Sequence, residues 1–431
     1  MIRQRAALLS FGASVAFLAL VYGHLSSAYG WFPDAFLSRA REQAEALIAW
    51  PEFLVPIVYE RSGVRVVSPD RMEPGLTLVA SVWGDLDWTA GLKLMDRRGR
   101  VLHTWRVDGE EVFDGIPAER DVRFPYIHGT YLFPDGDVLV NLDLVGTVRL
   151  DACGRVLWSR ADGGHHSIAR ADDGTFWIPT IHLDARPSSD AFPDGYPGLD
   201  GPVYHDGIHR ITEDGEVLDE ISVFEVLYAN GLERYLRKAP WVDLDPTHLN
   251  DVEPLPAAMA AEYPLFSAGD LLLSLRNLHM VLVLDPSTGR VKWHARDPFI
   301  LQHDPDFLGD GWIGVFDNNR DRTRRGAMLG GTRIVAVRPH TGEREVLFPG
   351  PASDPFYTEF MGKWQRLEGG NLLLTEAKAG RAVEVGPRGG TVWEWINEPY
   401  NEFQVPEVTE ATRYPLSAED VSTWRCAVSP P

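Results

Sequence analysis

Six copies of one short motif constrain the fold of this chain more than any other feature of its sequence. Each copy is a turn glycine followed by a run of β-branched or leucine residues, and four copies end in tryptophan. Successive copies begin 48 to 74 residues apart. A period near 50 residues, with about four strands per unit, is typical of β-propellers. The alternative is a chance set of glycine turns in a β-sandwich. We therefore predict an all-β, six-bladed β-propeller over residues 64–431. The copies are Gly99–Trp105, Gly154–Trp158, Gly215–Leu218, Gly289–Trp293, Gly342–Leu347 and Gly390–Trp393.

A second element precedes most copies: a histidine, seven residues, and then a glycine that leads into an apolar strand. It begins at His128, His166 and His303, and in the sixth copy the same register places a glycine at Gly362. Equivalent positions of propeller blades are related by rotation about the central axis. Histidines at one register therefore converge on the axis, and His248 lies in the blade between the second and third of them.

The polar residues expected near the axis are rich in hydrogen-bond donors and poor in carboxylates. This composition suits an anion that carries its charge on several oxygens. A neutral imidazole can act as a nucleophile, and Arg, Asn and protonated His can stabilise the oxygens of a loose phosphoryl-like or sulfuryl transition state. The chain contains neither a G-x-S-x-G elbow nor a P-loop. The candidates are His128, His165, His166, His248, Asn250, Arg276 and His303.

The N-terminus carries a targeting signal. Arg3 and Arg5 precede an uncharged run from Ala6 to Tyr22, which is near the lower length limit of a spanning helix. The charge asymmetry orients the N-terminus to the cytoplasm. We predict a single-pass inner-membrane anchor over residues 1–28, with a cleaved signal peptide as the alternative. Both place the catalytic domain in the periplasm. Residues 29–63 form a linker segment with an amphipathic helix over 34–50.

Charge and cysteine content exclude several classes of function. The chain has 41 Lys and Arg against 62 Asp and Glu, a formal net charge of −21. This excess argues against nucleic acid as a partner, because phosphate binding needs a basic surface. The two cysteines, Cys153 and Cys426, form neither a disulfide framework nor a CxxC zinc site.

Several segments resemble the bacterial arylsulfate sulfotransferase family, in consistent order over residues 75–400. Thr247–Asn250 resembles the family's H-x-N segment, and Leu273–Asn277 its S-x-R-N strand. The Q-H-D and F-D-N pair is matched by Phe299–Asp304 and Val315–Asn319. The double-histidine and last-blade segments are matched by Gly164–His166, Gly380–Val385 and Val392–Glu394.

The resemblance implies a periplasmic six-bladed propeller that needs no cofactor. It implies PAPS-independent transfer of a sulfuryl group from a phenolic sulfate ester to a phenolic acceptor, by ping-pong through a sulfohistidine. The matched positions make His303 the nucleophile. His166 corresponds to the functional histidine of the family's double-histidine segment, and His165 is the alternative for that position. His248 and Arg276 join the catalytic set, and Asn250 binds substrate. His165 and His128 complete the substrate-binding candidates, and no metal ligand is expected.

The sequence departs from the family pattern in three places. Asp251 stands where a serine is usual, no close cysteine pair is present, and the N-terminal helices replace an extra β domain. These departures bear on the substrate, the acceptor and the oligomeric state more than on the fold. A homodimer is compatible with the sequence.

Two other functions fit the same histidines. One is a propeller enzyme that holds a metal ion on four of the histidines, since imidazole is a good ligand for transition metals. Two points count against it: Arg276 would disfavour a cation, and the known propeller enzymes with four histidine ligands have seven blades. A non-enzymatic periplasmic binding propeller is the other alternative. A quinone-dependent dehydrogenase is a weaker alternative, because the sequence shows no carboxylate pair that suggests a calcium site.

Overall fold

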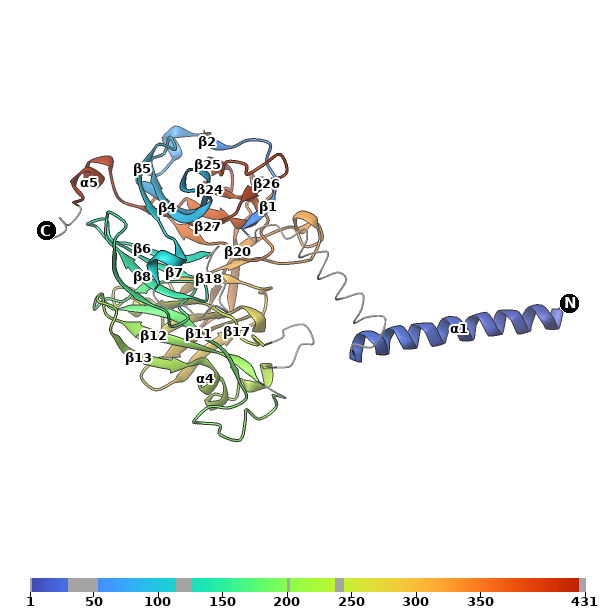
Figure 1. Ribbon diagram of the computed structural model, residues 1–431. Coiled ribbons are helices and arrows are strands. Elements are labelled where there is room, and N and C mark those ends of the chain that lie inside the picture. Colours follow the sequence, from blue (N-terminus) through green and yellow to red (C-terminus); the bar gives the residue numbers. More distant parts are fainter. Residues whose placement is uncertain (1, 30–52, 114–125, 200–201, 237–243, 426–431) are drawn as a thin grey trace. The chain divides into compact units, whose positions relative to one another are not determined.

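The computed structural model describes residues 2–29, 53–113, 126–199, 202–236 and 244–425 (Figure 1). The chain divides into two compact units, residues 1–52 and 53–431. The first contains helix α1 (Ile2–Tyr29). Among the described residues, no helix combines the length and apolar character that crossing a bilayer requires. The predicted transmembrane anchor over residues 1–28 is therefore not confirmed. The helix predicted over residues 34–50 lies outside the described residues.

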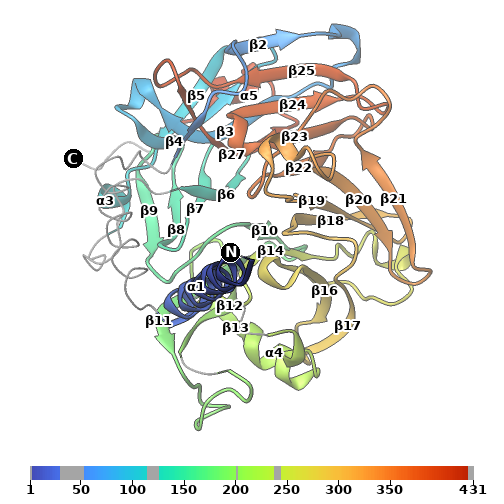
Figure 2. The same ribbon diagram turned by 90° about the vertical axis from the view of Figure 1, so that its right-hand side faces the viewer.

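The second unit is a β-propeller of six antiparallel sheets (Figure 2), as predicted. From the axis outward, blade 1 contains β27 (Val408–Tyr414), β3 (Leu76–Trp83), β4 (Thr89–Met95) and β5 (Val101–Arg106). Blade 2 contains β6 (Ile127–Leu132), β7 (Val138–Leu142), β8 (Gly146–Leu150) and β9 (Val156–Arg160). Blade 3 contains β10 (Ala169–Arg170), β11 (Phe176–Arg186), β12 (Val203–Ile211) and β13 (Val217–Ser222).

The remaining blades follow the same order. Blade 4 contains β14 (Leu249–Pro254), β15 (Leu271–Leu275), β16 (Met280–Asp285) and β17 (Arg290–Ala295). Blade 5 contains β18 (His303–Gly309), β19 (Trp312–Asp317), β20 (Arg333–Arg338) and β21 (Glu343–Phe348). Blade 6 contains β22 (Trp364–Arg366), β23 (Leu372–Glu376), β24 (Arg381–Val385) and β25 (Thr391–Ile396), with β2 (Gly63–Val66) added outside β25.

The ring is closed at two places by strands from opposite ends of the chain. The late strand β27 forms the inner edge of blade 1 and pairs with β3, which comes from the N-terminal side. The early strand β2 pairs with β25 of blade 6. In addition, β1 (Leu54–Pro56) pairs with β26 (Gln404–Pro406). Strands from both ends of the domain therefore complete the first and last blades of the ring.

The six repeated motifs form the fourth strand of each blade, with their glycines in the preceding turn. Gly99, Gly154, Gly215, Gly289 and Gly342 have φ between 68° and 82°, the left-handed region in which a Cβ is unfavourable. The apolar residues then pack between blades. Six core clusters are present among the described residues, one for each pair of neighbouring blades. Trp105 and Trp393 are fully buried members, so these two tryptophans pack between blades.

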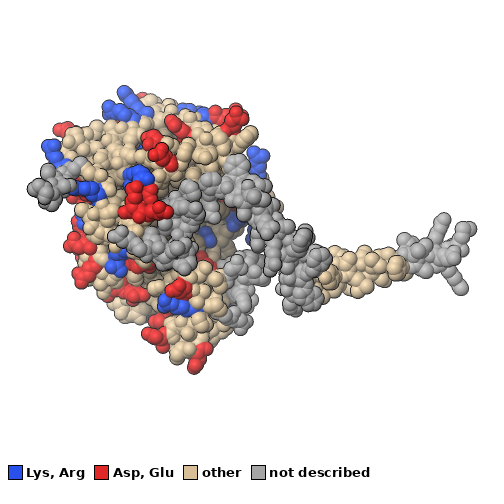
Figure 3. Space-filling view, in the orientation of Figure 1, with Lys and Arg blue, Asp and Glu red and all other residues tan. Residues whose placement is uncertain are grey.

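Short helices decorate the blades. α4 (Val223–Ala229) begins at Ser222, whose hydroxyl accepts a hydrogen bond from the Glu225 amide. The others are α3 (Gly109–Val112), α5 (Ala418–Thr423), η1 (Pro69–Arg71), η2 (Gly84–Leu86), η3 (Glu233–Tyr235), η4 (Ala260–Glu262), η5 (Arg276–Leu278), η6 (Arg324–Gly326) and η7 (Ala377–Ala379). Acidic and basic side chains intermingle on the face shown in Figure 3.

Cys153 lies in the turn before β9 and is disulfide-bonded. The chain's second cysteine, Cys426, lies outside the described residues.

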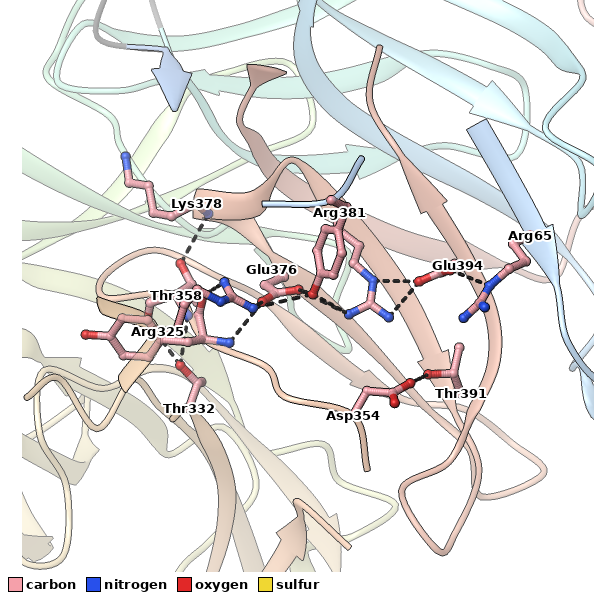
Figure 4. Close-up of polar contacts among 12 residues, drawn as sticks. Arg65, Arg325, Thr332, Asp354, Thr358, Glu376, Lys378, Arg381, Thr391 and Glu394 are labelled. Carbon is pink, nitrogen blue, oxygen red and sulfur yellow. Dashed lines mark hydrogen bonds and ion pairs between the residues drawn. The ribbon is translucent and has the colours of Figure 1, made fainter. Parts of the chain in front are cut away.

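A buried ionic network joins the segment just before β2, which contains Tyr59, to blades 5 and 6 (Figure 4). Glu376 is fully buried and pairs with Arg325 at 2.6 Å and Arg381 at 3.1 Å. Arg381 continues to Glu394 at 2.7 Å. The Tyr59 hydroxyl donates to Glu376 at 2.7 Å, and burial together with Glu376 raises the pKa of Tyr59. Buried carboxylates require such partners, so the network fixes this side of the ring.

Candidate functional site

The predicted site residues come from two kinds of loop at one end of the propeller. His128 and His303 lie at the start of the inner strands β6 and β18, and His248 directly precedes β14. Arg276 begins the turn between β15 and β16. In an antiparallel blade, the start of the first strand and the turn after the second strand lie at the same end. This geometry brings the histidine positions and the turn positions together.

Five imidazoles surround the axis at this end. The Nδ1 atoms of His165 and His166 are 2.7 Å apart. The ring of His166 stacks on His128, with centroids 4.4 Å apart and planes at 28°. It meets His248 edge-on at 5.2 Å and lies 6.4 Å from His303. His166 therefore lies close to four other imidazoles, and His128, His166 and His303 line one cavity.

The backbone of the double-histidine segment is held by Asn141 on β7. Its side-chain amide donates to the carbonyl oxygens of His165, His166 and Ser167 at 3.1 to 3.2 Å. His166 and His248 have φ of 52° and 49°, and backbone strain of this kind clusters at functional sites. The surrounding strands thus hold both histidines in conformations that an isolated chain would avoid.

His303 presents one nitrogen to the cavity as an unprotonated lone pair. Its Nδ1 lies 2.7 Å from Oδ1 of Asn318 and 3.1 Å from the carbonyl oxygen of Leu301. Both neighbours are acceptors, because the Asn318 amide nitrogen donates to two backbone carbonyls, at 2.7 and 3.0 Å. The hydrogen therefore belongs on Nδ1. Nε2 is buried and has no hydrogen-bond partner among the described residues. Burial, reinforced by Arg276, lowers the pKa of His303 well below its usual value.

His248 forms a carboxylate–imidazole pair with Asp245. Its Nδ1 makes a very short contact to one Asp245 oxygen, and its backbone amide donates to the other at 2.8 Å. Its Nε2 is buried and has no partner in the described part of the chain. Burial and Arg276 lower the pKa of His248, and Asp245 partly opposes them. A carboxylate behind an imidazole orients the ring and stabilises its charged form.

Arg276 and Asn250 are fixed by neighbouring backbone groups. The Arg276 amide donates to the His248 carbonyl at 3.0 Å, and its Nε donates to the Asn277 side chain at 3.2 Å. Asn250 donates to the Gln302 carbonyl at 2.9 Å. Burial lowers the pKa of Arg276, while Asp245 and Asp143 oppose that shift. The guanidinium is thus the principal positive charge beside His248 and His303.

His165 lies behind His166 and is 2 % exposed. Its Nε2 is 3.9 Å from Asp206, a carboxylate that accepts from the Thr247 hydroxyl and the Leu249 amide. Burial lowers the pKa of His165 to about 4. Of the two double-histidine candidates, His166 is the one that lines the cavity.

The cavity at the axis holds about 40 Å³ and is lined by both histidines and carboxylates. His128, His166, Asn250 and His303 line it beside Asp251, Asp304, Lys363 and Glu410. Lys363 pairs with Glu410 at 3.3 Å. Burial, together with Asp304, raises the pKa of Asp251 well above its usual value. The position at which the sequence departs from the family's serine therefore lines the same cavity as the histidines.

The sequence analysis missed four residues that orient the site: Asn141, Asp143, Asp245 and Asn318. Asn318 lies within a segment already matched to the family. Asp143 occupies the turn between β7 and β8, which corresponds to the position of Arg276 in blade 4. Alignment of the turns after the second strands, as well as the histidine register, would have placed Asp143 near the axis.

The fold and this site define a six-bladed β-propeller with a polar, histidine-rich centre at one end of its axis. The model of the arylsulfotransferase (ASST) family matches residues 129–398, which is more than half of the chain. The chain therefore belongs to the arylsulfotransferase family. Family membership supports aryl sulfotransferase activity in general terms.

Other comparisons find only distant similarity. No curated protein matches the chain. Among solved structures, a protein of unknown function from Bacteroides caccae is 13% identical, with a TM-score of 0.47, and the match covers 78% of this chain and 98% of that one. Nidogen in its laminin complex is 13% identical, with a TM-score of 0.44 and coverage of 78% and 97%. The WD40 propeller of Doa1 is 10% identical, with a TM-score of 0.40 and coverage of 82% and 92%.

Proposed function

We propose that this protein is a PAPS-independent aryl sulfotransferase that works by ping-pong through a sulfohistidine at His303. The observation that carries the proposal is the state of His303. Its Nδ1 faces two acceptors, and its buried Nε2 keeps a free lone pair beside the cavity. A neutral imidazole held in one tautomer is a competent nucleophile.

In the first half-reaction, Nε2 of His303 attacks the sulfur of an aryl sulfate. The bond between sulfur and the phenolic oxygen breaks, and the phenolate leaves with both bonding electrons. The positive charge of the sulfated ring is stabilised through its Nδ1 hydrogen, which is donated to Asn318. Arg276 and the second amide hydrogen of Asn250 stabilise the sulfuryl oxygens, as preorganised donors do in other transferases.

In the second half-reaction, the oxygen of an acceptor phenol attacks the sulfur, and the nitrogen–sulfur bond breaks. This step restores the lone pair on Nε2. The phenol proton passes to Nε2 of His248, whose Nδ1 contacts Asp245. His248 returns that proton to the leaving phenolate of the next donor molecule. His166 and His128 line the cavity and complete the binding site for the sulfuryl group.

We propose the periplasm as the compartment. The disulfide at Cys153 supports an oxidising environment, since disulfides are rare in the cytosol. Association of residues 1–28 with the inner membrane is a separate proposal, tested by carbonate extraction of membranes from expressing cells. Recovery in the carbonate-soluble fraction would contradict it.

The test of the function uses the full chain with 4-nitrophenyl sulfate, with and without phenol. We expect release of nitrophenolate that depends on the acceptor and is lost in His303→Asn. His340→Asn is the matched control, because His340 is exposed in the turn after β20, and it should keep full activity. Release without an acceptor would indicate a hydrolase instead. The absence of release over a panel of phenols would overturn the proposal.

A further inference from the structure

We propose that His128, Asp143 and His166 form a binding site for one divalent transition-metal ion, and that an ion bound there inhibits sulfuryl transfer. The inhibition rests on the proposed function, whereas the metal site rests on geometry alone. The three side chains offer ligand atoms that all lie within 4.8 Å of one another.

The separations between these atoms fit a shared ion better than direct hydrogen bonds. Nδ1 of His128 lies 3.5 Å from Oδ1 of Asp143, and Nδ1 of His166 lies 3.7 Å from the same oxygen. Hydrogen bonds of this type are about 2.7 to 3.2 Å long. Ligands bound tetrahedrally to zinc at about 2.1 Å are separated by roughly 3.4 Å. The observed spacing therefore needs little adjustment to accept an ion.

Two of the three ligand atoms lack other partners. Nδ1 of His128 and Oδ1 of Asp143 are buried and make no hydrogen bond to any described residue. A buried acceptor without a donor is costly, and a cation between these atoms would satisfy both. Nδ1 of His166 instead contacts Nδ1 of His165 at 2.7 Å. An ion would take over the His166 lone pair and so replace this contact.

The ligands come from rigid parts of two adjacent blades. His128 lies on β6, Asp143 follows β7, and His166 precedes β10. Asn141, two residues before Asp143, holds the His166 carbonyl at 3.1 Å. The rings of His128 and His166 are stacked, with planes at 28°, so one ring has to turn before both Nδ1 lone pairs point at a shared ion. The backbone positions of the three ligands are preorganised, which separates a binding site from scattered ligands.

The ligand set indicates the class of ion and its effect. Two imidazoles and one carboxylate suit Zn²⁺, Co²⁺ or Ni²⁺ rather than Mg²⁺ or Ca²⁺. Three protein ligands leave coordination positions open, and the adjacent cavity also contains the free Nε2 of His303. Ligation of His303 would remove the lone pair that attacks sulfur. An ion at this site therefore blocks the reaction.

The binding test uses the full chain, first treated with EDTA and then titrated with Co²⁺, whose visible absorption reports an ordered site. We expect one Co²⁺ per chain. Asp143→Asn and His128→Asn should weaken binding at least tenfold, whereas His182→Asn, which removes a surface histidine, should not. His128→Cys should keep the ion and add a thiolate-to-cobalt charge-transfer band. That band would show that the position ligates the ion and does not only support the fold.

The inhibition test measures 4-nitrophenyl sulfate turnover with phenol at one equivalent of Zn²⁺. We expect more than tenfold inhibition that EDTA reverses. Turnover without stoichiometric Co²⁺ binding would overturn the site and leave the sulfotransferase intact. Wild-type affinity in Asp143→Asn would also overturn it. Co²⁺ binding without turnover of any donor would instead overturn the proposed function and the inhibition, and keep the metal site.

Discussion

The Nδ1 atom of His303 lies 2.7 Å from Oδ1 of Asn318, and the Asn318 amide nitrogen is itself held by the carbonyl oxygens of Thr358 and Met361. The second relationship fixes the first, because an amide that donates to two carbonyls presents only its oxygen to the histidine. The tautomer of His303 is therefore set by a residue that does not contact the cavity.

Asn318 is thus a positioning residue, and its removal should affect the chemical step more than substrate binding. We expect Asn318→Ala to lower kcat by about 10- to 100-fold, as for other residues that orient an imidazole, with KM nearly unchanged. Asn318→Asp keeps an acceptor oxygen for His303 but loses both donations to the backbone carbonyls, so it should recover only part of the loss. Steady-state kinetics with 4-nitrophenyl sulfate and phenol measure both. Equal losses in the two variants would indicate a role in folding only.

Catalysis should require the planar set of guanidinium hydrogen-bond donors of Arg276 as well as its positive charge. Arg276→Lys keeps the positive charge but removes the planar guanidinium that matches a group with several oxygens. We expect kcat/KM to fall by about 10²- to 10³-fold, the usual loss for one donor to a developing oxyanion. Arg344→Lys, an exposed arginine paired with Asp297 at 2.6 Å, is the control. An Arg276→Lys variant with normal kcat/KM would contradict this role.

The buried carboxylates of β14 and β18 should make the stability of the propeller depend on pH. Burial and Asp251 raise the pKa of Glu253 to about 8. The folded state therefore holds a proton that the unfolded state releases above about pH 4.5, so stability falls as the pH rises from there toward 8. Glu253→Gln removes this penalty.

We expect Glu253→Gln to raise Tm more at pH 8 than at pH 5, relative to the unmodified protein at each pH. Glu398→Gln, at an exposed position, should shift Tm equally at both values. Scanning calorimetry in buffers of equal ionic strength measures the difference. A larger gain at pH 5 would show that Glu253 is ionised in the folded protein.

Glu376 should be the most sensitive position of the ionic network. Glu376→Ala leaves Arg381 and Arg325 without their buried partner, which costs about 3 to 5 kcal/mol. Tyr59→Phe removes one hydrogen bond to the same carboxylate and costs about 1 kcal/mol. Denaturant unfolding followed by tryptophan fluorescence measures both. The reverse order of the two effects would show that Glu376 does not carry the network.

The repeat sequence by itself determined the fold. Each motif supplies a turn that needs a glycine and a strand that is apolar on the faces between blades, so the blade count and the outer strands follow from local rules. The histidine register likewise placed His128 and His303 on inner strands and His166 just before one, because rotational symmetry maps equal register to equal position.

Only the tertiary structure decided which atoms of the site are free. Alignment of the turns can place Asp143 near the axis, but the sequence does not show that it faces His128 and His166, because that proximity arises from turns and strands of two blades. The free Nε2 of His303 likewise depends on Asn318, fifteen residues away, and on carbonyl oxygens of the next blade. The register of the histidines repeats along the chain and can be read from the sequence. Hydrogen bonds between blades form only when the ring of blades closes, so they cannot be read in this way.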